Sequence, residues 1–361
     1  MKSLMRNFCS ASLLMLSFLG ASSKSYALVV LQYHHVSDKT PRSTSISPEL
    51  FKAHMAYIEK RQFRVLDILT LKRILQKGEA LPDASVVITF DDGYKSVYKH
   101  AFLELKKRAW PFAVFINTKS HDEKNPHFMS WEELKELQDA GAVIGNHTDS
   151  HPYLIRRRSG EAFKQWQKRR ALEIEFAEQR IKKKLGKSHK LFAYPFGEFD
   201  QSLKSYLKEN AYLAFGQQSG PIASNSDLQN IPRFPFGGAY GQLDDFSTKL
   251  LSLPFPQARV KVTTENGKVL SDPELPAGIG RPVLRIASPL MNYIGETACY
   301  ASGQGKINTD VKGGVLVAQA KTDLPSGRSR YNCTARAGGE RYYWYSQLFI
   351  RRKANGRWYS E

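Results

Sequence analysis

The sequence predicts an α/β domain built on a parallel sheet or barrel, followed by a small all-β sandwich. Short apolar runs alternate with amphipathic stretches over residues 28–254. Most of these runs are continuous, as expected for strands buried on both faces. Later in the chain the helical periodicity disappears, and glycine and proline turns separate β-prone runs. The change follows Pro254-Phe255-Pro256, so we expect residues 28–254 and 255–361 to form separate domains.

The expected elements follow from apolar runs, from capping residues and from the turn residues between them. In the first domain we expect strands at Leu28–Tyr33, Phe63–Leu66, Ser85–Phe90, Phe112–Asn117, Ala142–Gly145, Leu191–Tyr194 and Ala211–Phe215. The expected helices are one from Pro48, capped by Ser47, and those at Tyr94–Arg108, Ser130–Ala140 and Glu161–Leu185, the last closed by Gly186. In the second domain we expect strands at Arg259–Thr263, Gly314–Ala318 and Tyr342–Ile350. Because strands and helices alternate in the first domain, its sheet should be parallel.

Residues 1–27 have the pattern of a signal peptide. Lys2 and Arg6 give a positive start, residues 11–20 form an uncharged apolar run, and Ser25-Tyr26-Ala27 offers small residues at a cleavage site. An amphipathic helix that stays attached is the alternative. We therefore expect an exported protein, periplasmic or secreted, and no transmembrane segment in the remainder.

The cysteine count and the net charge bear on the compartment and the partners of the protein. Cys299 and Cys333 remain beyond the signal peptide, and an even count in an oxidising compartment favours a disulfide, with two free thiols as the alternative. The formal net charge of +19 favours an anionic partner such as a cell-surface polymer, although a solvated basic surface would have the same composition. No zinc-finger or RNA-recognition motif accompanies the charge, so no specific nucleic acid is expected.

Polar residues able to bind a metal ion follow two of the expected strands. Thr89-Phe90-Asp91-Asp92-Gly93 ends one apolar run, and Asn146–Pro152 follows another. Residues just past the carboxyl ends of barrel strands converge at one mouth. His147 and His151 with one aspartate make a three-ligand set that leaves a position for water, as in catalytic zinc sites. A metal ion there would activate the water, and the second aspartate could take its proton.

Each of these pieces is weakly specific by itself. Asp-Asp-Gly is a common turn, and two histidines at this spacing often occur without a metal. Their combination, in this order and each at the end of an apolar strand, makes the prediction specific. Zinc is the expected divalent ion, and cobalt or nickel would suit the same ligands.

With these motifs the sequence resembles the polysaccharide deacetylases of carbohydrate esterase family four, over roughly Leu28 to Phe246. Thr89–Gly93 matches the first motif of that family and His147–Pro152 the second, while Ala193–Gly197 resembles the third. The resemblance implies a distorted (β/α) barrel with about seven strands.

The resemblance also implies roles for individual residues. Asp91 would be the general base, with Asp92, His147 and His151 as metal ligands. The backbone amide of Phe196 in the third motif would help to hold the oxyanion, where developing negative charge needs a donor.

Two departures from the family pattern affect these roles. Ala193 occupies the place of the third motif's arginine, which in the family orients the catalytic aspartate. Arg233 is the candidate to replace that arginine, with a surface position as the alternative. The usual late histidine that acts as general acid is also missing. His34 ends the first expected strand, in Leu31–Val36, which resembles the biofilm poly-N-acetylglucosamine deacetylase branch. We take His34 as the candidate acid, with a structural or merely exposed histidine as the alternative, and His35 as a bystander.

These observations predict metal-dependent hydrolysis of acetamide groups on an N-acetylated polysaccharide or oligosaccharide, with release of acetate. A non-catalytic glycan-binding protein on the same barrel and an O-acetyl esterase are the alternatives. Biofilm poly-N-acetylglucosamine, peptidoglycan, chitin oligomers and a lipopolysaccharide sugar all remain candidate substrates. The β-sandwich is expected to be an accessory domain, because the candidate ligands all precede Phe246. Its aromatic run Tyr342–Tyr345 would either bind sugar or fill the sandwich core.

Overall fold

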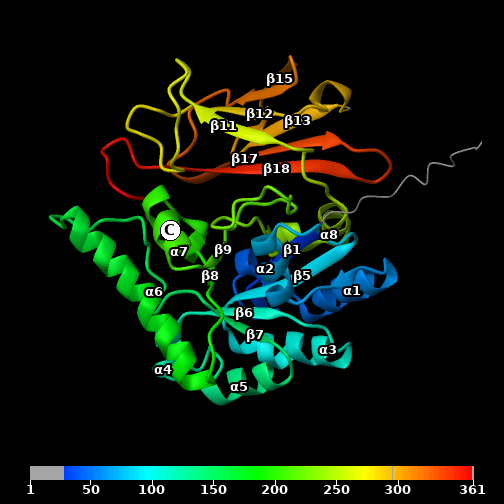
Figure 1. The fold of residues 1–361 in the computed structure, drawn as a ribbon, viewed down its shortest axis with the longest axis vertical. Coiled ribbons are helices and arrows are strands. Elements are labelled where there is room, and N and C mark those ends of the chain that lie inside the picture. Colours follow the sequence, from blue (N-terminus) through cyan, green and yellow to red (C-terminus); the bar gives the residue numbers. More distant parts are fainter. Residues whose placement is uncertain (1–27, 295, 360–361) are drawn as a thin grey trace, which may run out of the picture.

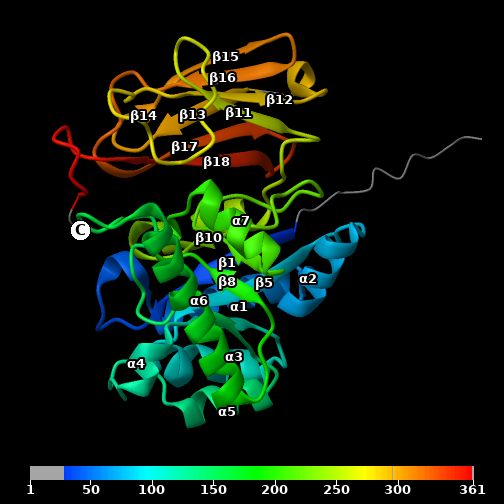
Figure 2. The ribbon, with the colours of Figure 1, turned by 60° about the vertical axis from the view of Figure 1, so that its left-hand side comes forward.

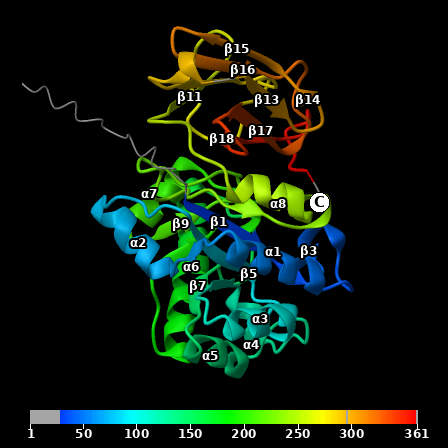
Figure 3. The same cartoon turned by 90° about the vertical axis from the view of Figure 1, so that its right-hand side faces the viewer.

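The computed structural model describes residues 28–294 and 296–359 (Figure 1). The expected signal peptide, residues 1–27, lies outside this part. A β domain, defined here as residues 259–359, lies against one side of an α/β barrel formed by the preceding residues (Figures 1 and 3).

The barrel is built on a curved sheet in which every strand pair is parallel. Its strands lie in the order β10-β1-β5-β6-β7-β8-β9, with β4 paired to the start of β5. The strands are β1 (Leu28–Tyr33), β4 (Arg64–Val65), β5 (Ser85–Asp92), β6 (Ala113–Ile116), β7 (Val143–Asn146), β8 (Leu191–Ala193), β9 (Leu213–Phe215) and β10 (Phe234–Pro235). Every residue of β1 and of β5 to β9 is buried, which explains why these strands are continuous apolar runs rather than alternating ones.

A short segment closes the curved sheet between β9 and β1. Ile231 forms a bridge with Phe215 at the end of β9, and β10 pairs with β1. The amide of Phe236 then donates to the carbonyl oxygen of Gln32 at 2.9 Å. The expected distorted barrel is confirmed, and β10 is a strand that the sequence pattern did not indicate.

Helices in the connections between the strands pack against the sheet. They are α1 (Pro48–Lys60), α2 (Ile68–Lys77), α3 (Phe102–Lys107), α4 (Thr118–Asp122), α5 (Trp131–Asp139), α6 (Phe163–Leu185), α7 (Gln201–Glu209) and α8 (Leu243–Leu250). The Ser47 side chain caps α1 as expected, and α6 ends at Gly186, whose φ of 80° favours glycine. The helix expected from Tyr94 begins one residue later, at Lys95, and is π-helical over Val97–Ala101, while Tyr94 itself forms a bridge with Phe128.

The β domain consists of two four-stranded antiparallel sheets, so the expected all-β sandwich is confirmed. One sheet has the order β11-β12-β16-β15 and the other β14-β13-β17-β18, and Figure 1 shows β17 and β18 nearest the barrel. The strands are β11 (Arg259–Thr263), β12 (Val283–Ala287), β13 (Thr297–Ala301), β14 (Gly305–Lys306), β15 (Asn308–Lys312), β16 (Val315–Gln319), β17 (Gly327–Arg336) and β18 (Tyr342–Arg351). Burial alternates along β17, so one face of this strand fills the sandwich and the other faces the barrel.

The barrel and the β domain share a hydrophobic cluster. It joins β-domain residues to residues around β8 and α7, and its members include Leu348, Ile350, Tyr359, Phe192, Tyr194, Phe199 and Leu203. Within the aromatic run of β18, Tyr343 and Tyr345 pack on the sandwich core, while Trp344 packs on the barrel core and meets Phe234 edge-on. Tyr343 and Tyr345 thus pack as expected for core residues, and Trp344 packs on the barrel.

Cys299 and Cys333 form a disulfide, as expected, and lie opposite each other in the pairing of β13 with β17. Two residues 34 positions apart are thereby linked inside the sandwich.

Replacing both cysteines with alanine should lower the free energy of unfolding of the β domain by about 2–5 kcal/mol, because the open chain gains conformational freedom when unfolded. Denaturant unfolding of wild type and of Cys299→Ala/Cys333→Ala measures the difference. Reduced wild type is the control and should move toward the double variant. Equal unfolding midpoints for the oxidised protein and the double variant would contradict the prediction.

Candidate active site

Three side chains that could hold a metal ion meet at one end of the barrel. Asp92 ends β5, and His147 and His151 follow β7. Asp92 Oδ1 lies 3.4 Å from His147 Nε2 and 3.5 Å from His151 Nε2, and the three ligand atoms lie within 4.8 Å of one another. In residues 28–294 and 296–359, no other group of three or more His, Cys, Asp or Glu side chains meets in this way.

The strand register brings these residues together. β5 pairs with β6 as far as Asp92, and β6 pairs with β7 as far as Asn146, so the ends of β5 and β7 lie level. Nδ1 of His147 lies 2.8 Å from the carbonyl oxygen of Ala193, a contact that fixes the ring with Nε2 toward Asp92. Asp92 and His151 have φ of 70° and 54°, a region that non-glycine residues rarely adopt. Such strain costs about 1–3 kcal/mol per residue and clusters at functional sites.

The donor set fits a divalent metal ion. Nε2 of His147 is buried and makes no hydrogen bond within the described part of the chain. A cation would supply the partner that this nitrogen lacks. Two imidazoles and a carboxylate, one imidazole held from behind by a carbonyl group, are the ligands and support typical of a catalytic zinc site. Cobalt and nickel suit the same atoms, so the ligands do not select one ion.

Burial and neighbouring groups set the protonation of the three ligands. Burial tends to raise the pKa of Asp92, but the contact with His147 lowers this pKa below its ordinary value, so the carboxylate is ionised. Burial, followed by the charge of His147, lowers the pKa of His151 to about 4. Burial also acts to lower the pKa of His147, but the contact with Asp92 reverses the effect and the pKa rises. An ionised Asp92 and a neutral His151 are the forms that bind metal.

Asp91 lies next to this cluster and has no exposure to solvent. Its carboxylate accepts two hydrogen bonds of 2.7 Å from Nη1 and Nη2 of Arg233, and a third of 2.6 Å from Nε2 of Gln32. Burial tends to raise the pKa of Asp91, but the Arg233 guanidinium lowers it below its ordinary value. Asp91 is therefore held as a carboxylate.

Arg233 reaches Asp91 from the segment that closes the barrel. Arg233 is fully buried, its Nε donates to the carbonyl oxygen of Gly216 at 2.8 Å, and its guanidinium lies 5.5 Å from the ring centroid of Phe115. Ala193 offers only a methyl group. In the structure the Arg233 guanidinium therefore contacts Asp91, the carboxylate that the third-motif arginine was expected to orient. The alternative of a surface position for Arg233 is wrong, because this residue is buried.

His34 leaves β1 beside Asp91. Tyr33 pairs with Phe90 across β1 and β5, so the next residues on the two strands, His34 and Asp91, are neighbours at the barrel mouth. His34 is half-buried, and its charge acts on the pKa of Asp91. This placement is compatible with a proton donor near the cluster.

His35 turns away from the cluster. Its ring stacks on Tyr94, with ring centroids 3.6 Å apart, and its Nδ1 lies 3.3 Å from Oγ of Ser96. Burial lowers the pKa of His35 to about 4, so this imidazole is neutral. His35 is a packing residue.

Gln32 and Tyr94 are site residues that the sequence reasoning missed. Gln32 donates a hydrogen bond to Asp91. Burial, followed by the nearby Asp92 carboxylate, raises the pKa of Tyr94. Each had a signal in the sequence. Gln32 is a lone polar residue in an apolar strand, and Tyr94 directly follows the first motif.

Phe196 lies beside His151, in a left-handed conformation with φ of 59°. Its ring stacks on Tyr153, with centroids 4.0 Å apart, and meets the His151 ring edge-on at 4.5 Å. Gly197 also has a positive φ, and a Cβ there would lie 2.7 Å from the side chain of Gln217, so a larger residue would not fit. The third motif is thus held next to the metal cluster.

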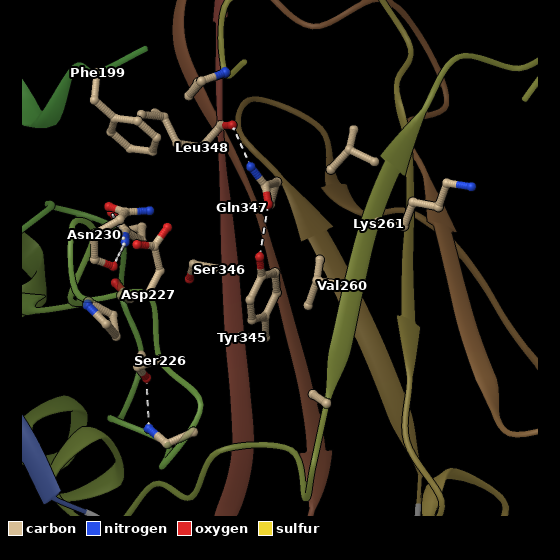
Figure 4. Close-up of a pocket in the computed structure, with 18 of the residues that line it drawn as sticks. Phe199, Ser226, Asp227, Asn230, Val260, Lys261, Tyr345, Ser346, Gln347 and Leu348 are labelled. Carbon is tan, nitrogen blue, oxygen red and sulfur yellow. Dashed lines mark hydrogen bonds between the residues drawn. The ribbon is translucent and has the colours of Figure 1, made fainter. Parts of the chain in front are cut away.

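A separate cavity of about 580 Å³ lies between β11, β18 and the barrel loop before β10 (Figure 4). Tyr345 and Gln347, joined by a hydrogen bond of 2.8 Å, lie between the two strands, and Asp227 and Asn230 line the barrel side. None of the candidate site residues lines this cavity.

The family model described as polysaccharide deacetylase matches residues 78–215. The matched range includes both aspartates, both histidines and Phe196. His34 and Arg233 lie outside it.

Two relatives are poly-beta-1,6-N-acetyl-D-glucosamine N-deacetylases. The protein from Escherichia coli strain K12 is 23% identical over 240 residues, which span 57% of this chain and 36% of that protein. The protein from Staphylococcus aureus strain MRSA252 is 28% identical over 208 residues, which span 56% of this chain and 71% of that protein. The match thus spans about a third of the length of the E. coli relative.

Solved structures share the fold. IcaB from Ammonifex degensii superimposes with a TM-score of 0.53 at 26% identity, covering 60% of this chain and 94% of that chain. The Streptococcus pyogenes deacetylase PplD, in complex with acetate, gives a TM-score of 0.54 at 19% identity, with the same coverage of 60% and 94%. The chain therefore carries a polysaccharide deacetylase domain over residues 78–215.

Proposed function

We propose that the protein is an exported, metal-dependent N-deacetylase that hydrolyses acetamide groups of an N-acetylated polysaccharide and releases acetate. The names of the relatives favour poly-β-1,6-N-acetylglucosamine as the substrate. The observation that carries the proposal is an arginine-paired Asp91 beside a three-ligand metal cluster. The Cys299–Cys333 disulfide supports export. Among the described residues, no helix combines the length and apolar character that a membrane crossing requires.

Asp92, His147 and His151 would hold the ion. When bound, a divalent ion polarises the acetamide carbonyl and lowers the pKa of a water molecule toward about 7. The three side chains would set the position of the ion, because they lie next to Asp91 and Phe196.

Asp91 would act as the general base. A carboxylate offers about four lone-pair directions, and Arg233 and Gln32 occupy three of them. The remaining direction can accept a proton from a water molecule at the metal cluster. The same three hydrogen bonds fix the plane of the carboxylate, so the base is oriented before substrate binds.

Phe196 and His34 would complete the reaction. The Phe196 N–H would donate to the oxygen that gains negative charge during attack, and one such donor is typically worth about 10²–10³ in rate. His34, on the neighbouring strand, would give a proton to the departing amine, because an amine leaves poorly without one.

The two alternatives from the sequence differ in what they would release. The missing third-motif arginine and the missing late histidine left a non-catalytic glycan-binding protein open, and the buried Arg233–Asp91 pair speaks against the first of these two reasons. An O-acetyl esterase would use the same residues to release an alcohol. Acetate release from matched N-acetyl and O-acetyl glucosamine oligomers, with zinc, cobalt or nickel supplied, separates the three. Release only from esters would indicate an esterase, and no release by metal-loaded protein would indicate a binding protein.

The two adjacent aspartates should give different losses. Asp92→Asn should lose metal and activity together, because two histidines alone hold a divalent ion poorly. Asp91→Asn should keep the metal and lose about 10²–10⁴-fold in rate, because it removes mainly the proton transfer. Elemental analysis and acetate release on the same samples measure both effects. The opposite pattern of metal loss would reverse the two roles, and full activity of both variants would refute the deacetylase proposal.

His34→Ala should slow N-acetyl substrates by about 10²–10⁴-fold and activated acetate esters much less, because activated alcohols leave without a proton. Rates on a matched amide and ester measure the difference. His35→Ala is the control, since this neighbour packs on Tyr94, and it should affect both substrates alike. Equal losses on amide and ester in His34→Ala would point to a structural role.

Arg233→Met should lower the free energy of unfolding by about 3–5 kcal/mol, because it leaves the Asp91 carboxylate buried and unpaired. The double variant Asp91→Asn/Arg233→Met should recover part of that loss, since both charges are then gone. Urea unfolding of wild type, the two single variants and the double variant gives the coupling energy. Strictly additive losses would show that the two residues do not stabilise each other.

A further inference from the structure

Glu198 is a buried carboxylate that the proposed mechanism does not use. It directly follows the third motif and is 1% exposed. Its Oε1 accepts hydrogen bonds from Nη1 of Arg328, at 3.2 Å, and from the Tyr359 hydroxyl, and lies 3.6 Å from Nη2 of Arg156. Arg328 and Tyr359 belong to the β domain, whose last residues descend toward the barrel in Figure 2. We call Glu198 and these three partners the Glu198 clamp.

The clamp also reaches the ring of Phe196. The Arg328 guanidinium lies 5.4 Å from the Phe196 ring centroid, and Tyr153 stacks on the same ring. Arg156 lies 3.3 Å from the Tyr153 centroid and 4.5 Å from that of Tyr359, and its Nη1 donates to the Tyr359 carbonyl oxygen at 3.1 Å. The third motif is therefore held between the barrel and the end of the β domain.

Phe196 needs such support. A bulky residue with φ of 59° lies in a strained region of backbone conformation, which persists only where its surroundings over-determine it. Glu198 ties the chain two residues further along, where its carboxylate is fixed by partners that are expensive to separate from it. Asp91, in contrast, takes its hydrogen bonds from barrel residues, and the metal ligands are also barrel residues.

We propose that the β domain completes the active site through the Glu198 clamp, with Arg328 and Tyr359 as positioning residues for the Phe196 amide. The inference rests on the deacetylase function proposed above. It gives the β domain a part in catalysis, in place of the accessory role expected from the sequence. A misplacement of about 1 Å in a catalytic group can cost about 10²-fold in rate, so a loosened clamp should be visible in turnover.

Two variants of the full chain test the clamp. Tyr359→Phe removes the hydroxyl that donates to Glu198 and keeps the ring on which Arg156 packs. Arg328→Met removes the charge and keeps much of the side-chain length. Arg328→Lys is the conservative variant and should restore part of the lost rate, because it keeps the charge without the planar fork.

The β domain offers a matched control for each variant. Tyr331→Phe removes a buried hydroxyl that donates to the carbonyl oxygen of Pro282 at 3.0 Å, inside the sandwich. Arg351→Met removes a guanidinium paired with Asp323 at 2.7 Å in the same domain. Both controls weaken the β domain without touching Glu198.

Four quantities are measured on each protein: kcat, KM, bound metal and the amide resonance of Phe196 in chain labelled with ¹⁵N-phenylalanine. Both clamp variants should lose about 10-fold or more in kcat, with KM within about two-fold of wild type and metal content unchanged, because they disturb an interaction made in the transition state. Their Phe196 resonance should shift. The controls should keep the wild-type kcat and resonance, and melting temperatures show whether each variant is folded.

The outcomes separate this inference from the function on which it rests. If wild type is active and both folded clamp variants match their controls in kcat and in the Phe196 resonance, the inference is overturned. If metal-loaded wild type releases no acetate from any substrate but the Phe196 resonance shifts only in the clamp variants, the positioning contact stands and the deacetylase proposal fails.

Discussion

A carboxylate buried from bulk solvent needs its counter-charge inside the protein, and Asp91 obtains it from Arg233. Two hydrogen bonds from one guanidinium fix the plane of the carboxylate, and Gln32 supplies a third from β1. Because Arg233 belongs to the segment that joins β9 to β1, this ion pair ties the middle of the sheet to its closure. The residue that orients Asp91 therefore lies in the same segment whose backbone pairing closes the barrel.

At the candidate metal site, four residues have left-handed backbone conformations: Asp92, Thr148, His151 and Phe196. Different contacts hold Asp92, His151 and Phe196. Asp92 is the last residue of a fully buried strand and contacts His147. His151 packs against the ring of Phe196. Phe196 in turn is held by the stacked ring of Tyr153 and by the Glu198 clamp. Strain of this kind persists only where packing over-determines the backbone, so the site depends on more of the molecule than its ligands.

Several features could be predicted from sequence because their signals are local. The barrel strands are continuous apolar runs, and the candidate metal ligands lie at or just after the ends of two strands that parallel pairing brings level. β10 was missed because two residues, one of them proline, carry no periodicity. α7 and α8 were missed although α7 is as long as α5, because no glycine follows either helix to mark its end, as Gly141 does for α5. The contact of Glu198 with Arg328, 130 positions away, depends on how two sheets pack, and no local pattern reports it.

The position of Arg233 bears on how related proteins are recognised in genomes. A search that scores residues position by position counts Ala193 as the loss of an arginine, and the range matched by the family model ends before Arg233. In the folded protein a guanidinium still contacts Asp91, but it comes from Arg233, directly before β10, and not from the third motif. Chains set aside as inactive for want of the third-motif arginine are better judged by whether any buried guanidinium reaches the first aspartate. Selection on such a site acts on the position of the guanidinium relative to the carboxylate, and the segment that carries the arginine is free to change.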